Sequence, residues 1–420
     1  MSFLTRNLPL STAGLLALGV ALTSCGESRD SSQPSPTTSV ASPASGAGSP
    51  GSPSATGEDD DAAGATSFSL SEEQNPPFSV EAVGTYDSPW AVEILPGGQS
   101  LLITTRDGTV ILRDLDGDRE LSLTGVPEPV VAGQGGLGDV VAGPTYDQDG
   151  TVYLSWVQAG DTGTGAVIGR ATLEDSGDQT ALEDLEVIWE QVPKTTGNGH
   201  FGHRMAFSPD GEHLFVTSGD RQEMDPAQDL DSSLGKILRL TPDGEPAPGN
   251  PFADRGEVAA EVWSYGHRNP LGLAFAPDGT LWSSEMGPQG GDELNRIEEG
   301  QNYGWPQASN GSHYGGGDIP DHTDSDEFTG PQAWWNPSVS PAGMIIYDSD
   351  LFPDFQGDAL IGALSGQALI HVRIDGDRAI DGQIWPMEAR IRDIAQAPDG
   401  SIWVIEDGSD AQLLRLTPQT

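Results

Sequence analysis

Ser208-Pro209-Asp210-Gly211, followed by the alternating residues His213-Leu214-Phe215-Val216, is the stretch that decides the fold, because the same phrase recurs along the chain. Clear copies begin at residues 147, 276 and 397, and a looser copy begins at residue 96. Pro-Asp-Gly supplies a tight turn and the residues after it alternate as in a strand, so each copy predicts a hairpin. Repeated antiparallel units without helical periodicity predict an all-β fold, which we expect to be a six-bladed β-propeller of four-stranded antiparallel blades.

The N-terminal part of the chain has the composition of an export signal and a tether. Arg6 precedes an apolar run over residues 8–22 that ends in Leu22-Thr23-Ser24-Cys25, which resembles a lipobox, so we expect residues 1–25 to be a lipoprotein signal peptide. The alternative for Cys25, the only cysteine, is a free thiol. Residues 26–70 are rich in Ser, Pro, Gly and acidic residues and predict a disordered linker, which leaves 71–420 as one propeller domain.

These features predict where the protein works and what it avoids. We expect an exported cell-envelope lipoprotein that touches the membrane only through a lipid on Cys25, with the propeller on the extracytoplasmic side. The net charge of −45 would repel nucleic acid over most of the surface, so nucleic acid is excluded as a partner. In so acidic a chain, each retained arginine is a candidate for a specific partner.

Several polar clusters lie between the predicted hairpins, where propellers place their ligand sites. Gln134 lies in a glycine-rich turn, and His200 and Asp220 bracket one hairpin at the same end, as a general base and its orienting partner require. A hydrogen-bonded surface turn is the alternative for that pair. His200 and His203 also have a spacing that could bind a metal, but no third ligand with zinc spacing follows.

Residues 265–306 hold the densest set of chemical groups in the chain. Arg268, two carboxylates, a tyrosine and turns built on Gly and Pro predict a site for an anionic ligand and a hard metal. Near the C-terminus, Arg390 and Arg392 alternate on a predicted strand and would present two guanidiniums side by side, an arrangement that suits bidentate binding of carboxylates. A solvent-exposed face without function is the alternative for this pair.

Together these clusters resemble the soluble glucose/sorbosone dehydrogenase family, especially its aldose sugar dehydrogenases, from about Ser88 to the C-terminus. The motifs that carry the resemblance are Gly266-His267-Arg268-Asn269-Pro270 and Asn302-Tyr303-Gly304-Trp305-Pro306, with Asp292-Glu293 between them. The resemblance implies a six-bladed propeller that binds pyrroloquinoline quinone (PQQ) and calcium. It also implies oxidation of aldose sugars at the anomeric carbon to lactones, with hydride transfer to the quinone and an electron acceptor that the sequence does not name.

The resemblance also assigns expected roles to individual residues. His200 falls at the position of the base, Asp220 would orient it, and Arg268 could stabilise negative charge on the quinone as it is reduced. The residues expected to contact the quinone are Gln134, Arg268, Asn269, Arg390 and Arg392. The residues expected to bind calcium are Gly287 and Pro288 through their carbonyls at the cofactor, and Glu293 and Tyr303 at a second, structural ion.

The chain departs from the family pattern at Leu271 and Met286, where relatives carry glutamine, at Ser365 in place of a lysine, and at His203 in place of a small residue. Loss of the lysine would weaken quinone binding by about one to two orders of magnitude if nothing replaces it. Two alternatives therefore stay open: a propeller that lost catalysis and serves as a surface binding module, and a calcium-dependent lactonase or hydrolase. A nicotinamide enzyme is disfavoured, because the glycines of residues 163–169 have the wrong spacing and no helix follows them.

Overall fold

The computed structural model describes residues 71–73, 75–323 and 327–419. The expected signal peptide (1–25), the linker (26–70) and Cys25 lie outside the described residues. No helix within the described part of the chain is long and apolar enough to cross a membrane.

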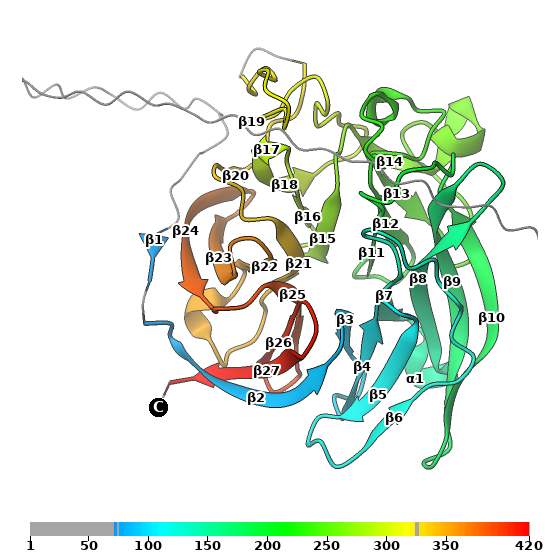
Figure 1. Cartoon of the computed structure of the whole chain (residues 1–420), viewed down its shortest axis with the longest axis vertical. Helices are drawn as coiled ribbons and strands as arrows, with labels where there is room; N and C mark the ends of the chain where they lie inside the picture. The colour runs from blue at the N-terminus through cyan, green and yellow to red at the C-terminus, as the bar shows by residue number, and fades with distance from the viewer. Residues whose placement is uncertain (1–70, 74, 324–326, 420) are drawn as a thin grey trace, which may run out of the picture. The chain divides into compact units, whose positions relative to one another are not determined.

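Six four-stranded sheets stand in a ring, which confirms the predicted six-bladed propeller (Figure 1). From the innermost strand outward, the first three blades are β3 (Pro89–Ile94), β4 (Ser100–Thr105), β5 (Thr109–Asp114) and β6 (Glu120–Ser122); β7 (Leu137–Ala142), β8 (Thr151–Ala159), β9 (Thr164–Asp175) and β10 (Thr180–Glu190); and β11 (Gly202–Phe207), β12 (Leu214–Ser218), β13 (Lys236–Leu240) and β14 (Val262–Tyr265). The strands within each of these blades pair antiparallel.

The ring closes by pairing the two ends of the propeller in one sheet, since β2 is the outer strand of the blade formed by the C-terminal strands. The last three blades are β15 (Pro270–Phe275), β16 (Leu281–Glu285), β18 (Asp292–Ile297) and β20 (Ala333–Trp335); β21 (Pro341–Ile346), β22 (Ala359–Ala363), β23 (Ala368–Asp375) and β24 (Arg378–Pro386); and β25 (Ile391–Gln396), β26 (Ile402–Glu406), β27 (Ala411–Pro418) and β2 (Phe78–Tyr86). Short accessory strands are β1 (Ser71–Glu72), which pairs parallel with β24, and β17 (Gln289–Gly290) with β19 (Gly311–Ser312).

The recurrent phrase marks the same place in five blades, the connection between the first and second strands, with Asp-Gly in four of them and Pro-Gly-Gly at residues 96–98 in the fifth. In four of these turns the Asp side chain accepts the backbone N–H two residues later, at 2.9–3.0 Å, which is the reason Asp is needed there: Asp149 to Thr151, Asp210 to Glu212, Asp278 to Thr280 and Asp399 to Ser401. In the blade of β21 and β22 a longer connection over residues 347–358 replaces the turn. That blade therefore carries no copy of the phrase.

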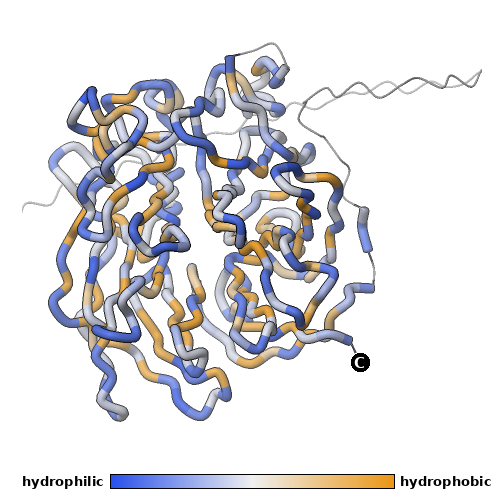
Figure 2. Tube along the Cα trace, turned by 180° about the vertical axis from the view of Figure 1, so that it is seen from behind, coloured by the Kyte–Doolittle hydropathy of each residue, from blue (hydrophilic) through white to orange (hydrophobic). Residues whose placement is uncertain are grey.

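Within the described residues, helical structure is confined to short turns in the connections. These are α1 (Tyr146–Asp149) and the 3₁₀ turns η1 (Asp225–Gln228), η2 (Ala253–Arg255), η3 (Glu257–Glu261) and η4 (Pro353–Phe355). The apolar core lies between neighbouring blades: one buried cluster joins Trp90 and Leu102 of the first blade to Leu154 and Val167 of the second. Figure 2 shows the same division, with apolar residues along the strands and polar residues in many of the loops.

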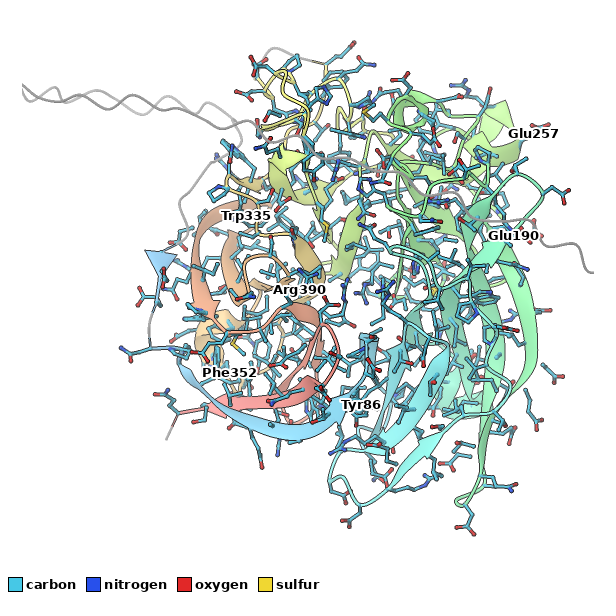
Figure 3. All side chains as sticks on the ribbon, in the orientation of Figure 1. Tyr86, Glu190, Glu257, Trp335, Phe352 and Arg390 are labelled. Carbon is cyan, nitrogen blue, oxygen red and sulfur yellow. The ribbon has the colours of Figure 1, made fainter. Side chains whose placement is uncertain are left out.

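The six innermost strands surround the axis of the ring and leave a channel. The loops that enter these strands meet at one end of it, and the first-to-second-strand turns lie at the other. Arg390, just before β25, lies near the centre of the ring, whereas Glu190 and Glu257 lie at its edge (Figure 3). The end where the inner strands begin therefore brings loops from all six blades together.

Candidate functional site

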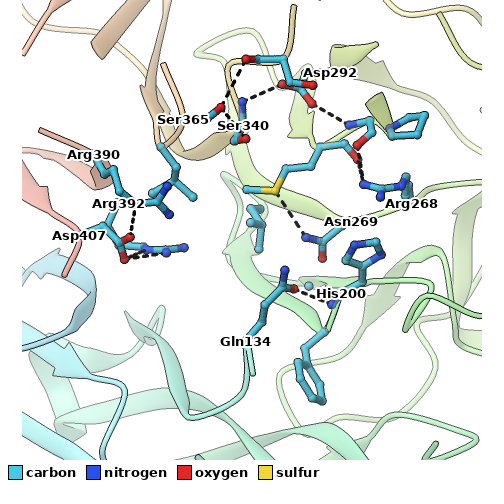
Figure 4. Close-up of a pocket in the computed structure, with 18 of the residues that line it drawn as sticks. Gln134, His200, Arg268, Asn269, Asp292, Ser340, Ser365, Arg390, Arg392 and Asp407 are labelled. Carbon is cyan, nitrogen blue, oxygen red and sulfur yellow. Dashed lines mark hydrogen bonds and ion pairs between the residues drawn. The ribbon is translucent and has the colours of Figure 1, made fainter. Parts of the chain in front are cut away.

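A cavity of about 810 Å³ opens where the inner strands begin, and every blade contributes to its lining (Figure 4). One lining residue from each blade, in chain order, is Trp90, Gln134, His200, Arg268, Ser340 and Arg392. The sequence clusters between hairpins thus converge on a single cavity, because the ring brings the starts of all six inner strands together.

His200 and Asp220 form a buried pair at one side of the cavity. The Nδ1 atom of His200 lies 2.7 Å from Oδ1 of Asp220, and the aspartate side chain is fully buried. Asp220 also accepts hydrogen bonds from the Gln222 backbone N–H at 2.8 Å and from the Trp305 indole N–H at 2.7 Å. Surrounded by donors, the carboxylate fixes the proton of the imidazole on Nδ1, which leaves Nε2 as the acceptor.

The backbone around this pair is unusual and explains its precise placement. His200 has a φ of 49°, in the left-handed region that costs energy for a residue with a side chain. Gly219 lies directly behind it, where an added Cβ would sit 2.2 Å from the carbonyl oxygen of His200. The close approach therefore requires glycine at residue 219, one position before Asp220.

Gln134 contacts the backbone of the histidine. Its side-chain Oε1 accepts the His200 backbone amide at 2.7 Å (Figure 4). The backbone amide of Gln134 donates to the carbonyl of Asn198 at 2.8 Å. The glycine-rich turn is held in turn by Arg106, which donates to the carbonyls of Gly133 and Gly135 and lines the cavity. Arg106 is a cavity residue that the sequence did not single out, because it lies alone at the end of a strand.

Arg268 and Asn269 lie next to the His200–Asp220 pair, in the loop before β15, where the Arg268 carbonyl accepts the Asp220 backbone amide at 2.8 Å. Arg268 donates from Nη1 to the carbonyls of Met286 at 2.9 Å and Gly287 at 2.5 Å, and its guanidinium lies 5.3 Å from the ring of Trp305. The Nδ2 atom of Asn269 lies 3.9 Å from the sulfur of Met286. Arg268 Nε and Asn269 Oδ1 are buried and have no hydrogen-bond partner among the described residues, so both are available to a ligand.

Arg390 and Arg392 do lie side by side, and they share one carboxylate that the sequence did not reveal. Asp407, between β26 and β27, accepts from Arg390 at 2.6 Å and from two nitrogens of Arg392 at 2.7 and 3.0 Å (Figure 4). Burial opposes ionisation of Asp407, but the two arginines outweigh it and lower the pKa of that carboxyl. One aspartate between two arginines leaves a net positive charge at the cavity wall.

Gly287 and Pro288 line the same cavity, and Asp292 fixes their turn. The carboxylate of Asp292 accepts from the amides of Gly287 at 2.9 Å and of Val339 and Ser340 at 2.7 Å each. Burial raises the pKa of Asp292 to about 6 in spite of these three donors. The backbone of Gly287 is thus held at both polar groups, because its amide donates to Asp292 and its carbonyl accepts from Arg268.

Glu293 and Tyr303 lie together at a second, very small cavity that Gly287, Pro288 and Glu285 also line. Burial and the neighbouring Glu285 raise the pKa of Glu293 well above its usual range. The hydroxyl of Tyr303 is already used, since it donates to the carbonyl of Arg296 at 2.5 Å and accepts the Glu298 amide at 2.9 Å. A cation here would therefore take the backbone carbonyl of Tyr303 and would relieve the repulsion between the two glutamates.

No cluster of three His, Cys, Asp or Glu side chains poised for a metal exists within the described part of the chain. A metal at Gly287 and Pro288 would therefore depend on carbonyl oxygens, a donor type that calcium accepts and zinc does not favour.

The residues that depart from the family pattern all lie at the cavity. Leu271 packs in the apolar cluster of Trp90, and Ser365 lies 2.7 Å from the hydroxyl of Ser340. His203 forms part of the floor, stacked on Trp90 at 5.0 Å and bonded through Nδ1 to Ser155 at 2.7 Å. Burial, with help from Arg204 and Arg221, lowers the pKa of His203 to about 3, so it is neutral at ordinary pH.

Proteins of known sequence and structure share sequence motifs and fold with this chain. Residues 86–415 match the family described as Glucose / Sorbosone dehydrogenase. The chain is 40% identical over 342 residues to the aldose sugar dehydrogenase YliI of Escherichia coli K12, an alignment that covers 79% of this chain and 91% of that protein.

Solved structures agree with the sequence comparison. The apo form of the soluble aldose sugar dehydrogenase from Escherichia coli superposes with a TM-score of 0.77 at 38% identity, covering 81% of this chain and all of that one. The PQQ-bound form of an aldose sugar dehydrogenase from Streptomyces coelicolor superposes with a TM-score of 0.67 at 33% identity, covering 82% of this chain and 99% of that one.

Proposed function

The chain belongs to the glucose/sorbosone dehydrogenase family, and on that premise we propose that it is a quinoprotein that oxidises aldose sugars at the anomeric carbon to lactones with PQQ and calcium. The observation that carries this proposal is the cavity itself. The buried His200–Asp220 pair lies at one side of the cavity, and Arg268, Arg390 and Arg392 line the same cavity. The same cavity thus offers a base for the sugar and cations for the quinone.

The charge of the lining fits the carboxylates of PQQ. The cavity is lined by four arginines, Arg106, Arg268, Arg390 and Arg392, and by two carboxylates, Asp292 and Asp407. An excess of cations at one place is notable in a chain with a net charge of −45. The unpartnered Nε of Arg268 and Oδ1 of Asn269 add a donor and an acceptor to that lining. Guanidiniums bind carboxylates with two parallel hydrogen bonds, so the donor set is suited to a polycarboxylate cofactor.

Calcium fits the neighbouring oxygen atoms. The carbonyls of Gly287 and Pro288 would hold one ion at the cofactor, and Glu293 with the carbonyl of Tyr303 would hold the second. The raised pKa of Glu293 reflects buried negative charge that a divalent cation would offset.

The protein supplies the proton transfer and the orientation. Nε2 of His200 would accept the proton of the anomeric hydroxyl, and Asp220 would stabilise the imidazolium that results. Arg268, which lines the same cavity, would favour negative charge on the cofactor as it is reduced. When bound, PQQ supplies the two-electron oxidant that takes the hydride from the anomeric carbon, and calcium polarises it.

The test is a titration of apoprotein, stripped with a chelator, by PQQ in the presence and absence of calcium. We expect PQQ to bind saturably, as monitored by the quenching of tryptophan fluorescence. We also expect aldoses to reduce an artificial dye only when both PQQ and calcium are present. Magnesium in place of calcium is the matched control, because its preference for octahedral geometry at short distances does not suit carbonyl ligands of this kind. Binding without turnover would favour the surface binding module, and absence of binding at micromolar PQQ would overturn the proposal.

A further inference from the structure

Arg221 is a buried cation directly behind the loop that carries His200, and it does not line the cavity. Its side chain is not used by the chemistry proposed above. Only 1% of the residue is exposed, so its position is set by the protein alone. A guanidinium in such a place has a high desolvation cost, which requires an explanation.

The guanidinium of Arg221 is bonded to the backbone of the segment before His200 and to the backbone of the neighbouring blade. Nε donates to the carbonyl of Gly199 at 2.9 Å, Nη2 donates to the carbonyl of Gly197, and Nη1 donates to the carbonyl of Thr164 in β9 at 2.6 Å. The plane also stacks on the ring of Phe201, with 3.8 Å from the guanidinium carbon to the ring centroid. Residues 197, 199 and 201 are thus all held by one side chain.

The backbone of Arg221 contacts the base as well. Its amide donates to the carbonyl of His200 at 3.2 Å, and the preceding residue is Asp220, the partner of the imidazole. Arg221 and His200 have φ values of 56° and 49°, so both lie in the left-handed region. Two strained residues in contact persist only where their surroundings over-determine them.

Arg221 forms no ion pair with a carboxylate among the described residues; its side-chain partners are three carbonyls, a hydroxyl and an aromatic face. Burial lowers the pKa of Arg221 to about 10, although Glu223 and Asp220 act in the opposite direction. A cation that gains no ion pair and yet stays buried must contribute through the geometry of its five donors. That geometry is a rigid fork, which lysine lacks.

We propose that Arg221 is the positioning residue of the base: its guanidinium fixes the loop of residues 197–201 so that His200 keeps Nδ1 on Asp220 and presents Nε2 to the cavity. This role rests on the proposed function of His200. Because Arg221 touches neither the cofactor region nor the sugar region, it governs turnover and leaves ligand binding unchanged.

The test uses two variants and one matched control. Arg221→Gly removes the side chain and keeps a residue that tolerates the positive φ, and Arg221→Lys keeps a cation without the fork. Arg239→Lys is the control, since Arg239 is also stacked on an aromatic ring, that of Trp263 at 4.3 Å, and bonded to a backbone carbonyl, but it lies far along β13 at a different cavity.

We expect kcat to fall about 100-fold in Arg221→Gly and about tenfold in Arg221→Lys, since small misplacements of a catalytic group have effects of that size. KM and the PQQ dissociation constant should change by less than about threefold, because Arg268, Arg390 and Arg392, the cations expected to hold the quinone, keep their own contacts. Millimolar guanidinium should restore part of kcat in Arg221→Gly, whereas sodium chloride at equal ionic strength and urea should not. Arg239→Lys should keep the kcat of the parent protein.

A second readout does not depend on turnover. Hydrogen exchange of the apoprotein, followed by mass spectrometry, should show faster exchange over residues 197–201 in Arg221→Gly and unchanged exchange in the blade of β22 and β23. Unchanged exchange and unchanged kcat would overturn the role of Arg221, and so would a parallel loss of kcat and PQQ affinity that guanidinium fails to rescue. Failure of the parent protein to turn over sugar would instead overturn the proposed function, and the exchange result would still stand.

Discussion

The two ends of the central channel are formed by the same six inner strands, yet they have opposite charge. At the end where the strands begin, the cavity has four arginines against two carboxylates. At the other end, all six strands line a cavity of about 290 Å³ that holds Arg204 with three carboxylates, Glu93, Asp139 and Asp393. The fold therefore dictates neither the charge nor the role of a channel end.

The two ends differ most in how fully their polar atoms are paired. Arg204 donates to Asp139 at 2.8 Å, to Asp393 at 3.1 Å and to the carbonyl of Leu271 at 3.0 Å, so it joins β11 to the neighbouring inner strands β7 and β15 and to β25 across the channel. The carboxylates also accept backbone amides, that of Met205 by Asp139 and that of Val92 by Asp393. At the first end, by contrast, buried atoms of Arg268 and Asn269 have no described partner. Complete pairing marks a structural site, and incomplete pairing marks a ligand site.

The largest expected effect is a loss of turnover at the end of the channel where the inner strands begin. His200→Gln should lower kcat about 10²- to 10⁴-fold, because general-base catalysis contributes that much and an amide cannot accept the proton. The PQQ dissociation constant should stay within about threefold of the parent value, since the arginines remain. Steady-state dye reduction and a fluorescence titration measure the two quantities.

A second histidine provides the matched control. His371 on β23 is also buried and lies 2.7 Å from an aspartate, Asp358, but it packs against Phe355 and Trp385 away from the cavity. His371→Gln should keep kcat at a temperature where the variant is folded. Equal losses in the two variants would mean that the effect arises from a lost buried pair and not from catalysis.

The next largest effect is a loss of folding stability at the other end of the channel, where Arg204 lies. Arg204→Met should destabilise the propeller by about 3–5 kcal/mol, because it leaves Asp139 and Asp393 buried without their cation. Chemical denaturation at neutral pH measures the loss. A triple variant that also carries Asp139→Asn and Asp393→Asn should recover most of it, and a single variant as stable as the parent protein would show that this end does not join the blades.

The fold was largely predictable because its signal is local. The Asp of each Pro-Asp-Gly turn accepts an amide only two residues away, so the phrase fixes a hairpin without help from the rest of the chain. The blade of β21 and β22 escaped because residues 347–358 use a longer connection there. Pairing of β2 with β27 could not be predicted from local sequence, since it joins strands more than 300 residues apart.

The site was predictable only in part, for the same physical reason. His200, Asp220, Arg268 and Arg392 are in motifs whose neighbours in sequence are also neighbours in the cavity. Asp407 and Trp305 were missed as partners, because Asp407 meets Arg392 only once β25 and β26 have paired, and Trp305 meets Asp220 only where two neighbouring blades pack together. Arg106 was missed since a lone arginine after a strand has no distinguishing pattern.

The last expected effect is a change in how folding stability depends on pH. Burial, reinforced by Asp139 and Asp393, raises the pKa of Glu93 at the far end to about 8, while the Ala142 amide, which donates to Glu93 at 3.0 Å, acts against it. Because the folded-state pKa lies above the unfolded value of 4.5, the folded protein holds an extra proton between these two values. Stability is therefore fully present below pH 4.5 and is lost as pH rises towards 8.

Glu93→Gln keeps an acceptor for the Ala142 amide and removes the titration. We expect the variant and the parent protein to have similar unfolding free energies near pH 5, and the variant to be more stable than the parent protein near pH 8, because only the parent protein then carries the cost of ionising Glu93. Urea denaturation at the two pH values measures the difference. A variant that is less stable at pH 8 would mean that Glu93 is ionised and favourably paired there, and the far end would then need a cation besides Arg204 to balance its three carboxylates.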